Sequence, residues 1–229
     1  MSAVRAYFDQ HVQHQTTVTS LDGDRRLCYD QQVAIVESLL RPGMTVLDVG
    51  CGPALPYRSD RAYVIGLDPS ADSLAANTDV DERIVGTAKN IPLPDGCADL
   101  VVAFYSLHHM TGKSARETYL IRRRALFEMR RVLAVGGELL VFEMAPYPWA
   151  AVLQRCLWGT AKRLLDQHLD AYFWTAEQYR SALPYSSRER VFACPPFVTF
   201  PPVLSLPWLR IPRFLFPFEP TLIRWRKEF

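Results

Sequence analysis

The sequence predicts an α/β fold in which helices cover both faces of a parallel β-sheet. Two observations carry this prediction. Short apolar segments alternate along the chain with longer segments of helical periodicity, and the apolar segments lack the polar alternation of a strand with one wet face. With 229 residues, the chain is long enough for one such domain and a modest additional segment.

The elements can be placed in order along the chain. Apolar residues recur at helical spacing from Tyr29 until Pro42-Gly43 ends the run. Residues 114–133 form a long predicted helix that Gly136-Gly137 should end, and residues 146–182 form a second helical block. The predicted strands are 45–49, 63–67, 100–104 and 138–142, with 83–85 as a weaker candidate.

The segment that begins near residue 188 has a different character, because eight prolines divide it into short extended pieces rich in aromatic residues. Two closing strands are predicted at 188–193 and 221–226. The proline-rich piece between them is interpreted as a lid. A contact with a membrane surface through residues 195–229 is the alternative, since aromatic and basic residues are mixed there.

Charge and composition exclude several classes of protein. A formal net charge of +2 gives no general attraction to nucleic acid. The five cysteines show no CxxC spacing, and no apolar run approaches the roughly 18 residues of a membrane span. The sequence therefore predicts a cytoplasmic protein. Five arginines on the predicted helix 114–133 (122–124, 130 and 131) are interpreted as a solvated face.

A glycine turn follows the first predicted strand, in the order Asp48-Val49-Gly50-Cys51-Gly52. Glycine permits positive φ and lets a ligand approach the main chain closely. Asp68 ends the next strand, 18 residues after Gly50, where a carboxylate can accept both hydroxyls of an adenosine ribose. Strand, turn, strand and acid together predict a nucleoside-containing ligand. A tight turn with Asp68 as a helix cap is the structural alternative.

A nicotinamide dinucleotide is the competing ligand. Its fingerprint requires a third glycine in GxGxxG, packed in a helix that receives the pyrophosphate. Leu55 occupies that position and Pro56 follows it. The turn therefore disfavours a nicotinamide oxidoreductase, and the helix after the turn is expected to be short or displaced.

Four segments in order carry a resemblance to a known family: 46–54 (VLDVGCGPA), 64–70 (VIGLDPS), 86–110 and 130–144 (RRVLAVGGELLVFEM). The chain resembles the class I methyltransferases that use S-adenosylmethionine (SAM), in particular the small-molecule group of quinone-biosynthesis and natural-product enzymes. The resemblance covers roughly residues 29–145. It implies a Rossmann-like, seven-stranded, mostly parallel sheet with helices on both faces, an antiparallel last strand and a helical, proline-rich lid.

The resemblance also implies a division of the chain and a set of SAM-binding residues. The division is cap helices (1–40), a SAM-binding core (41–145), a helical segment covering the acceptor (146–185), and closing strands with the insertion (186–229). Two departures from the family pattern are Thr87, where an acid is common, and Ala54, in place of a third glycine. The implied SAM-binding residues are Asp48, Gly50, Cys51, Gly52, Asp68, Pro69, Thr87, Ala88, Tyr105 and Ser106.

Methyl transfer from a sulfonium is an in-line displacement that depends mainly on alignment. A base is needed only when the acceptor must lose a proton. His108 and His109 follow the strand 100–104 and are the candidate bases, and Glu143 ends the next strand and could orient a histidine. The alternative is that a histidine packs under the loop and Glu143 forms a salt bridge. No metal is predicted, because no ligand spacing is present.

The acceptor is expected to be a hydrophobic or aromatic small molecule, because Trp, Tyr and Phe are concentrated in residues 146–174. Cys194-Pro195-Pro196-Phe197 is similar to a motif of nucleic-acid methyltransferases, but it lies far from the strand that such a motif follows, so nucleic acid is disfavoured. A SAM-binding protein without methyl transfer is the alternative function. The oligomeric state stays open.

Overall fold

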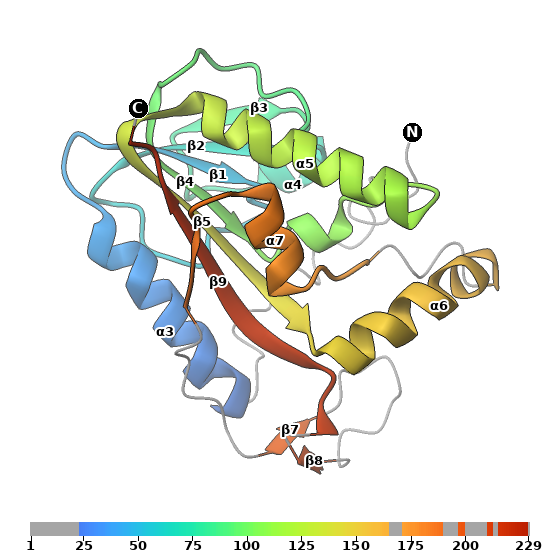
Figure 1. The fold of residues 1–229 in the computed structure, drawn as a ribbon. Coiled ribbons are helices and arrows are strands. Elements are labelled where there is room, and N and C mark those ends of the chain that lie inside the picture. The colour runs from blue at the N-terminus through green and yellow to red at the C-terminus, as the bar shows by residue number, and fades with distance from the viewer. Residues whose placement is uncertain (1–22, 165–170, 190–196, 200–209, 213–214, 229) are drawn as a thin grey trace.

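Seven strands form one sheet in the order β3-β2-β1-β4-β5-β9-β6 (Figure 1). The computed structural model describes residues 23–164, 171–189, 197–199, 210–212 and 215–228. The strands of the sheet are β1 (Thr45–Val49), β2 (Tyr63–Asp68), β3 (Glu82–Val85), β4 (Ala98–Phe104), β5 (Leu133–Pro146), β6 (Ser187–Glu189) and β9 (Phe218–Arg226).

The sheet is mostly parallel. Strand β1 pairs in parallel with β2 and β4, β2 with β3, and β4 with β5. Only β9 runs antiparallel to its neighbours, β5 and β6. The predicted α/β fold with an antiparallel last strand is confirmed. Because the chain leaves β1 in one direction and returns on its other side at β4, the carboxyl ends of these two strands border the crevice in which open α/β sheets bind ligands.

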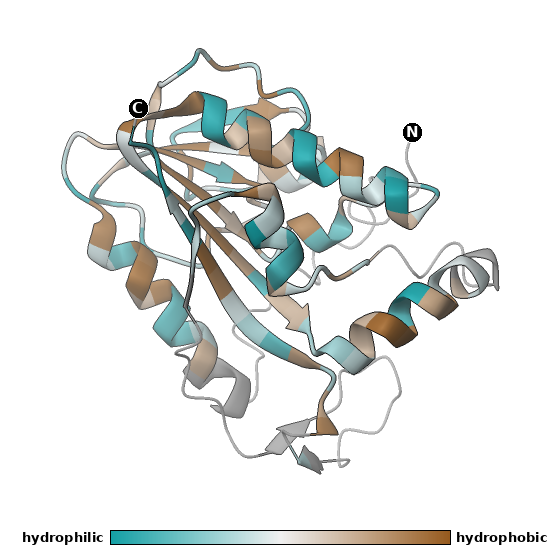
Figure 2. Cartoon of the chain, viewed as in Figure 1, coloured by the Kyte–Doolittle hydropathy of each residue, from teal (hydrophilic) through white to brown (hydrophobic). Residues whose placement is uncertain are grey.

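Helices cover both faces of the sheet (Figure 1). Helix α3 (Gly23–Leu39) packs Val36 against one face, where Val46 and Phe142 are buried. Helix α5 (Ala115–Val132) lies on the other face and buries Leu126 and Met129 there, beside α7 (Ala176–Ala182). The central strands are hydrophobic on both faces (Figure 2), as the continuous apolar segments predicted.

The remaining helices have clear boundaries. Ser70 caps the short α4 (Ala71–Ala76), and Ser114 caps α5, each by accepting the backbone N–H three residues later. Thr175 and Gln178 form a reciprocal capping box at the start of α7. The predicted helical block 146–182 is therefore two helices, α6 (Pro148–Leu164) and α7.

Two sequence predictions about this core need correction. Gly136 and Gly137 do not end the long helix, because α5 ends at Val132 and β5 begins at Leu133. Gly136, with φ of 82°, lies inside β5, close to where the pairing of β4 with β5 shifts register. The helix after the glycine turn was expected to be short or displaced. Residues 53–62 instead form turns and coil.

The carboxyl-terminal part contains the closing strands and a two-stranded sheet. Strand β6 confirms part of the predicted strand 188–193, of which residues 190–193 lie outside the described residues, and β9 extends the predicted strand 221–226. Strands β7 (Phe197–Thr199) and β8 (Arg210–Pro212) pair within the proline-rich insertion. Residues 1–22 of the predicted cap and residues 194–196 of the proline motif also lie outside the description.

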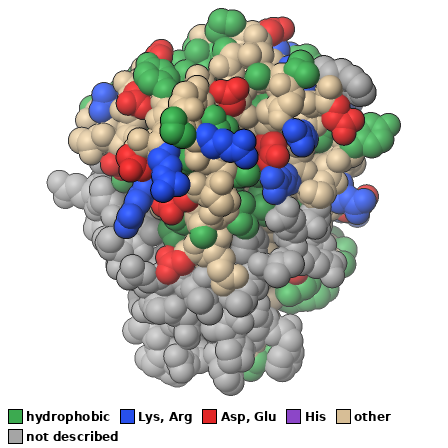
Figure 3. Space-filling model, turned by 90° about the vertical axis from the view of Figure 1, so that its left-hand side faces the viewer, with side chains coloured by type: hydrophobic (Ala, Val, Ile, Leu, Met, Phe, Trp, Pro, Cys, Tyr) green, Lys and Arg blue, Asp and Glu red, His purple; other side chains and the backbone are tan. Residues whose placement is uncertain are grey.

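Basic and acidic side chains are interspersed on the face of the molecule that Figure 3 presents. This mixture agrees with the nearly balanced count of 26 basic and 24 acidic residues. In the described part of the chain, no helix is both long and apolar enough to cross a membrane.

Candidate active site

The glycine turn follows β1 and is hydrogen-bonded to β2 on one side and to the residues after β4 on the other. Gly50 and Gly52 both adopt positive φ, at 78° and 60°. The N–H of Gly50 donates to the carbonyl of Leu67 on β2 at 2.7 Å. On the other side, Ser106 Oγ donates to the carbonyl of Val49 at 2.7 Å, and a Cβ at Gly50 would lie 2.5 Å from the Ser106 Cβ. At Gly50 the turn is therefore bare main chain, because a side chain would overlap Ser106.

Asp68 holds the far side of this turn. Its Oδ2 accepts the Gly52 N–H at 3.1 Å, and its Oδ1 accepts the Ser70 N–H at 2.8 Å. These two bonds orient the carboxylate at the end of β2, beside the turn. Asp68 is buried and lies where the sequence predicted it, at the carboxyl end of β2.

Asp48 is buried below the turn with one oxygen satisfied and one open. Tyr57 donates its hydroxyl to Asp48 Oδ2 at 2.7 Å, and within the described residues Asp48 Oδ1 is buried without a hydrogen-bond partner. Burial raises the pKa of Asp48 to about 7; the Tyr57 hydrogen bond lowers it, and the charge of Asp68 raises it further. A buried acid with an open oxygen is suited to receive an ammonium group, which would restore its charge.

Asp48→Asn should change the pH dependence of stability. Because the pKa of Asp48 is raised from 3.8 to about 7 in the folded protein, the folded state holds a proton between these values that the unfolded state has released. This group's contribution to stability is therefore largest below pH 4 and is lost as the pH rises to 7. We expect the melting temperature of the ligand-free wild type, relative to that of D48N, to fall across this range. A constant difference would contradict the buried, protonated acid.

Cys51 contributes its backbone and not its thiol to the turn. Burial and the charges of Asp48 and Asp68 raise the pKa of the thiol above its ordinary value, so it stays protonated. Tyr105, at φ of 52°, follows β4 and donates its hydroxyl to Gln32 of α3 at 2.8 Å. This bond fixes α3 against the crevice.

The residues expected near an adenine follow β2 and β3. The N–H of Gly86 donates to the carbonyl of Asp68 at 3.0 Å, which brings the loop after β3 to the glycine turn. In that loop Thr87 is exposed and Ala88 is buried, and Pro69 is exposed after β2. Thr87 and Asn90 form an isolated bridge. The structure therefore places this group at the same edge of the sheet as the turn.

His108 and Glu143 form a close pair across the ends of β4 and β5. His108 lies in η2 (Leu107–His109), and its Nδ1 is 2.8 Å from Glu143 Oε2. The backbone N–H of His108 also donates to Glu143 Oε1 at 3.1 Å. The carboxylate is 1% exposed and the imidazole 13% exposed. Two hydrogen bonds to one carboxylate fix both the position and the orientation of the ring, a contact that fits both an oriented base and the salt bridge considered as its alternative.

Aromatic rings cover this pair. Phe173 stacks on His108 with ring centroids 5.0 Å apart and planes 16° apart. The ring centroid of His109 lies 4.1 Å from that of His108. The segment that contains Phe173 thus lies against the ring of His108.

Arg122 connects the histidine loop to the aromatic segment. Its guanidinium donates to the carbonyls of His108 at 3.0 Å, Met110 at 3.2 Å and Tyr172. Its side chain is wholly buried and lies over the rings of Tyr172 and Trp174. The solvated basic face predicted for α5 is therefore wrong at this residue.

Arg122→Met should destabilise the protein because it removes the donor of the Met110 and Tyr172 carbonyls, while the His108 carbonyl keeps only the Tyr172 N–H at 3.0 Å. We expect the free energy of unfolding to fall by roughly 2–5 kcal/mol. Arg123→Ala is the matched control, since Arg123 is the next residue of the same helix and is exposed; its effect should stay within about 0.5 kcal/mol. Equal denaturant midpoints for the two variants would contradict this stabilising role of Arg122.

Sequence reasoning missed Arg122, Tyr57 and Gln32. A signal for Arg122 was present, because it continues the buried stripe of α5 that contains Ala125, Leu126 and Met129 at helical spacing. Tyr57 and Gln32 are recognisable only once the fold brings residues 29–57 together with the sheet edge.

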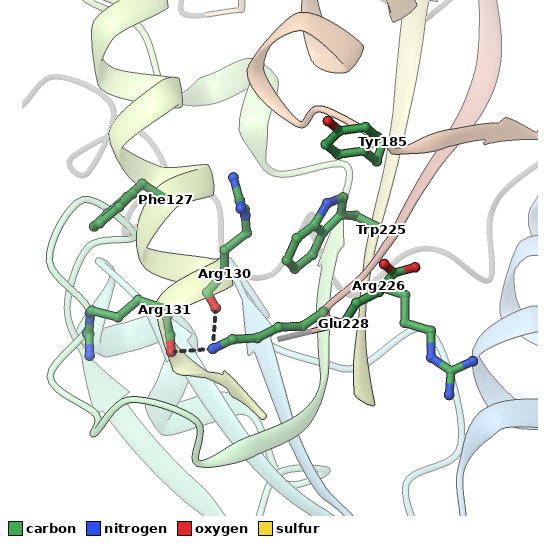
Figure 4. Close-up of a pocket in the computed structure, with 8 residues that line it drawn as sticks. Phe127, Arg130, Arg131, Tyr185, Trp225, Arg226 and Glu228 are labelled. Carbon is green, nitrogen blue, oxygen red and sulfur yellow. Dashed lines mark hydrogen bonds between the residues drawn. The ribbon is translucent and has the colours of Figure 1, made fainter. Parts of the chain in front are cut away.

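A separate cavity of about 600 Å³ lies near the amino-terminal end of β5, far along the sheet from the glycine turn (Figure 4). Phe127, Arg130, Tyr185 and Trp225 line it. Lys227 Nζ donates to the carbonyls of Arg130, Arg131 and Leu133 and so caps the end of α5. Lys227 of this basic cavity thus has a structural role, and the cavity lies outside the candidate active site. Among the described residues, no cluster of His, Cys, Asp or Glu is placed to hold a metal ion.

Comparison with known families agrees with this geometry. Residues 47–141 match the family described as Methyltransferase domain. These residues run from the glycine turn through β4 and α5 into β5. Residues 47–141 are a class I, SAM-dependent methyltransferase domain.

The names of relatives that match this domain refer to different acceptors. The 27-O-demethylrifamycin SV methyltransferase of Amycolatopsis mediterranei is 35% identical over 48% of this chain and 42% of its own length. A ubiquinone/menaquinone biosynthesis C-methyltransferase of Paraburkholderia phymatum is 32% identical over 48% and 47%. The mouse protein named "Probable tRNA methyltransferase 9B" is 29% identical over 48% and 23%. The chain thus spans less than half the length of these relatives.

Solved structures share a fold with most of this chain. A SAM-dependent methyltransferase from Thermotoga maritima has a TM-score of 0.61 at 19% identity, with 98% of this chain and 99% of that chain covered. The geranyl diphosphate C-methyltransferase of Streptomyces coelicolor A3(2) has a TM-score of 0.58 at 15% identity, with 86% and 78% covered. At such identities the likeness establishes the fold, including the part outside residues 47–141.

Proposed function

We propose that this chain is an enzyme that transfers a methyl group from SAM to a hydrophobic or aromatic small molecule. The observation that carries the proposal is the buried His108–Glu143 pair, which lies at the same sheet edge as the glycine turn and is covered by aromatic rings. A cofactor turn and an apolar cover align the two reactants, and an oriented base serves an acceptor that must lose a proton.

The residues of the turn fit SAM, which supplies an electrophilic methyl group when bound. Asp68, oriented by the N–H groups of Gly52 and Ser70, would accept the ribose hydroxyls, and Asp48 Oδ1 offers a buried acceptor for the amino group. Gly50, Cys51 and Gly52 would present their main chain to the methionine part. The remaining contacts proposed are Pro69, Thr87 and Ala88 around the adenine, and Tyr105 and Ser106 beside the methionyl group.

His108 is proposed as the general base. When its Nδ1 donates to Glu143, the neutral ring keeps Nε2 as a free acceptor for a proton. Glu143 then stabilises the imidazolium that forms. His109 lies beside His108 and is the second candidate. Arg122 would act as a positioning residue, because it holds the carbonyl of His108.

The acceptor is proposed to bind under the helical segment 146–185, above the core 41–145. Phe173 brings aromatic surface to His108, which suits an apolar substrate, and the Tyr172 N–H ties this segment to the His108 carbonyl. The relatives named for rifamycin and quinone substrates support this class. Residues 1–40 would cap the crevice, and residues 186–229 would close the sheet and carry either the lid or a membrane contact.

The test is a transfer assay with methyl-labelled SAM and a fractionated extract of the native cell. The proposal predicts label in an apolar, low-molecular-mass fraction. Label in RNA would instead support the acceptor class of the mouse relative and contradict the proposal. Tight binding of SAM with no labelled product across the fractions would favour a SAM-binding protein that does not transfer methyl groups.

A further inference from the structure

Helix α6 has one face that packs on the protein. Ala150 and Trp158 are buried, and the Trp158 ring meets Tyr172 edge-on at 5.0 Å. Between them, Gln154 donates to the carbonyl of Phe173 at 2.8 Å and accepts its N–H at 2.9 Å. This inner face therefore holds the aromatic segment that covers His108.

The opposite face of α6 is apolar and exposed. Trp149, Val152, Leu153 and Leu157 are 53%, 58%, 52% and 52% exposed, and Cys156 is exposed between them. The spacing of these residues places them on one continuous stripe of the helix. Hydrophobic bands along α6 are visible where the helix extends away from the sheet (Figures 1 and 2). Four large apolar side chains gathered on one exposed stripe indicate an interaction surface.

The charge of α6 indicates which partner this stripe meets. The 17 residues of the helix include Arg155, Lys162 and Arg163 and no aspartate or glutamate. Over the rest of the chain the two signs are nearly balanced, and they are interspersed on the face that Figure 3 presents. A helix that combines an exposed apolar stripe, a tryptophan and only positive charge is typical of a segment lying in the surface of an anionic bilayer.

We propose that the outer stripe of α6 binds the surface of an anionic membrane. Trp149, Val152, Leu153 and Leu157 enter the interface between headgroups and acyl chains, and the positive charge of the helix favours anionic headgroups. This assignment differs from a contact through residues 195–229, and it does not depend on the reaction proposed above. It places the cover of His108 next to a lipid phase, because Gln154 ties that cover to the same helix.

Co-sedimentation with vesicles of phosphatidylcholine, with or without 30% phosphatidylglycerol, tests the proposal. The wild type should sediment with the anionic vesicles, and binding should weaken as salt increases. The double variant Leu153→Glu, Leu157→Glu should bind these vesicles at least about tenfold more weakly. Both positions are about half exposed, so folding should persist, and an unchanged melting temperature and SAM affinity would verify this.

Leu120→Glu is the matched control, since Leu120 is 53% exposed on α5. It should bind the anionic vesicles as the wild type does. Three outcomes would overturn the proposal: no binding by the wild type, equal binding by the double variant, or a wild-type dimer in sedimentation velocity that the double variant abolishes. The last result would show that the stripe joins two copies of the chain.

Discussion

Replacing Gly50 with alanine is expected to abolish measurable SAM binding. Gly50 has φ of 78°, and an added Cβ would lie 2.5 Å from the Cβ of Ser106. A non-glycine residue in this region costs about 1–2 kcal/mol, and the overlap adds about 1–3 kcal/mol unless Ser106 moves. Either response displaces the turn against β4. Calorimetric titration of the folded variant with SAM measures the loss, which we expect to exceed about 30-fold, the equivalent of some 2 kcal/mol.

Gly43 provides the matched control for this experiment. It has φ of 83°, and a Cβ there would meet nothing within 4 Å. Gly43→Ala should therefore lose about 1–2 kcal/mol of stability from backbone strain alone, while its SAM affinity stays at the wild-type value. Normal SAM binding by G50A, or an equal loss in both variants, would contradict the role of the bare turn.

Removing the base is expected to lower kcat without changing SAM affinity. His108→Asn eliminates the proton acceptor, so kcat should fall by roughly 10²–10⁴-fold. Glu143→Gln keeps the shape of the side chain but removes the charge that orients His108 and stabilises its protonated form, and it should produce a smaller loss. Steady-state assays on the acceptor found by methyl labelling, with parallel SAM titrations, separate these effects.

Glu138→Gln is the control for the carboxylate. Glu138 lies five residues earlier on the same strand β5 and also forms an ion pair, with Arg224 at 2.6 Å, away from His108. This variant should keep the wild-type kcat. Wild-type activity in H108N would show that the acceptor needs no base from this residue, and an equal loss in E138Q and E143Q would show that the effect is one of stability.

The strands could be predicted because their signal is local. Residues 45–49 and 100–104 are apolar on both faces, and a strand buried between two helical layers requires that composition. Asp48, Asp68, His108 and Glu143 could be placed for the same reason, since the carboxyl ends of parallel strands share one edge. The register shift near Gly136 depends on how β4 meets β5, so glycine there was mistaken for a helix stop.

The connections between distant segments could not be predicted. The partners of Arg122 lie at His108, Met110 and Tyr172, and no periodicity joins these positions. Tyr57 lies in the segment after the glycine turn, where a helix is usual. Its hydrogen bond to Asp48 depends on packing that also involves α3. The exposed stripe of α6 could not be distinguished in the sequence, because the aromatic content of this segment indicated only an apolar cover over the acceptor.

The central claim is that the edge of β1, β2 and β4 binds SAM, and calorimetric titration of the wild type and of Asp68→Ala tests it most directly. Asp79→Ala is the companion control, because Asp79 also anchors the loop after the turn, at Leu55 N, but lies outside the proposed contacts. The account predicts one saturable site in the wild type, about 10- to 100-fold weaker binding in D68A, and unchanged binding in D79A. No heat from the wild type, or equal affinities for wild type and D68A, would contradict it.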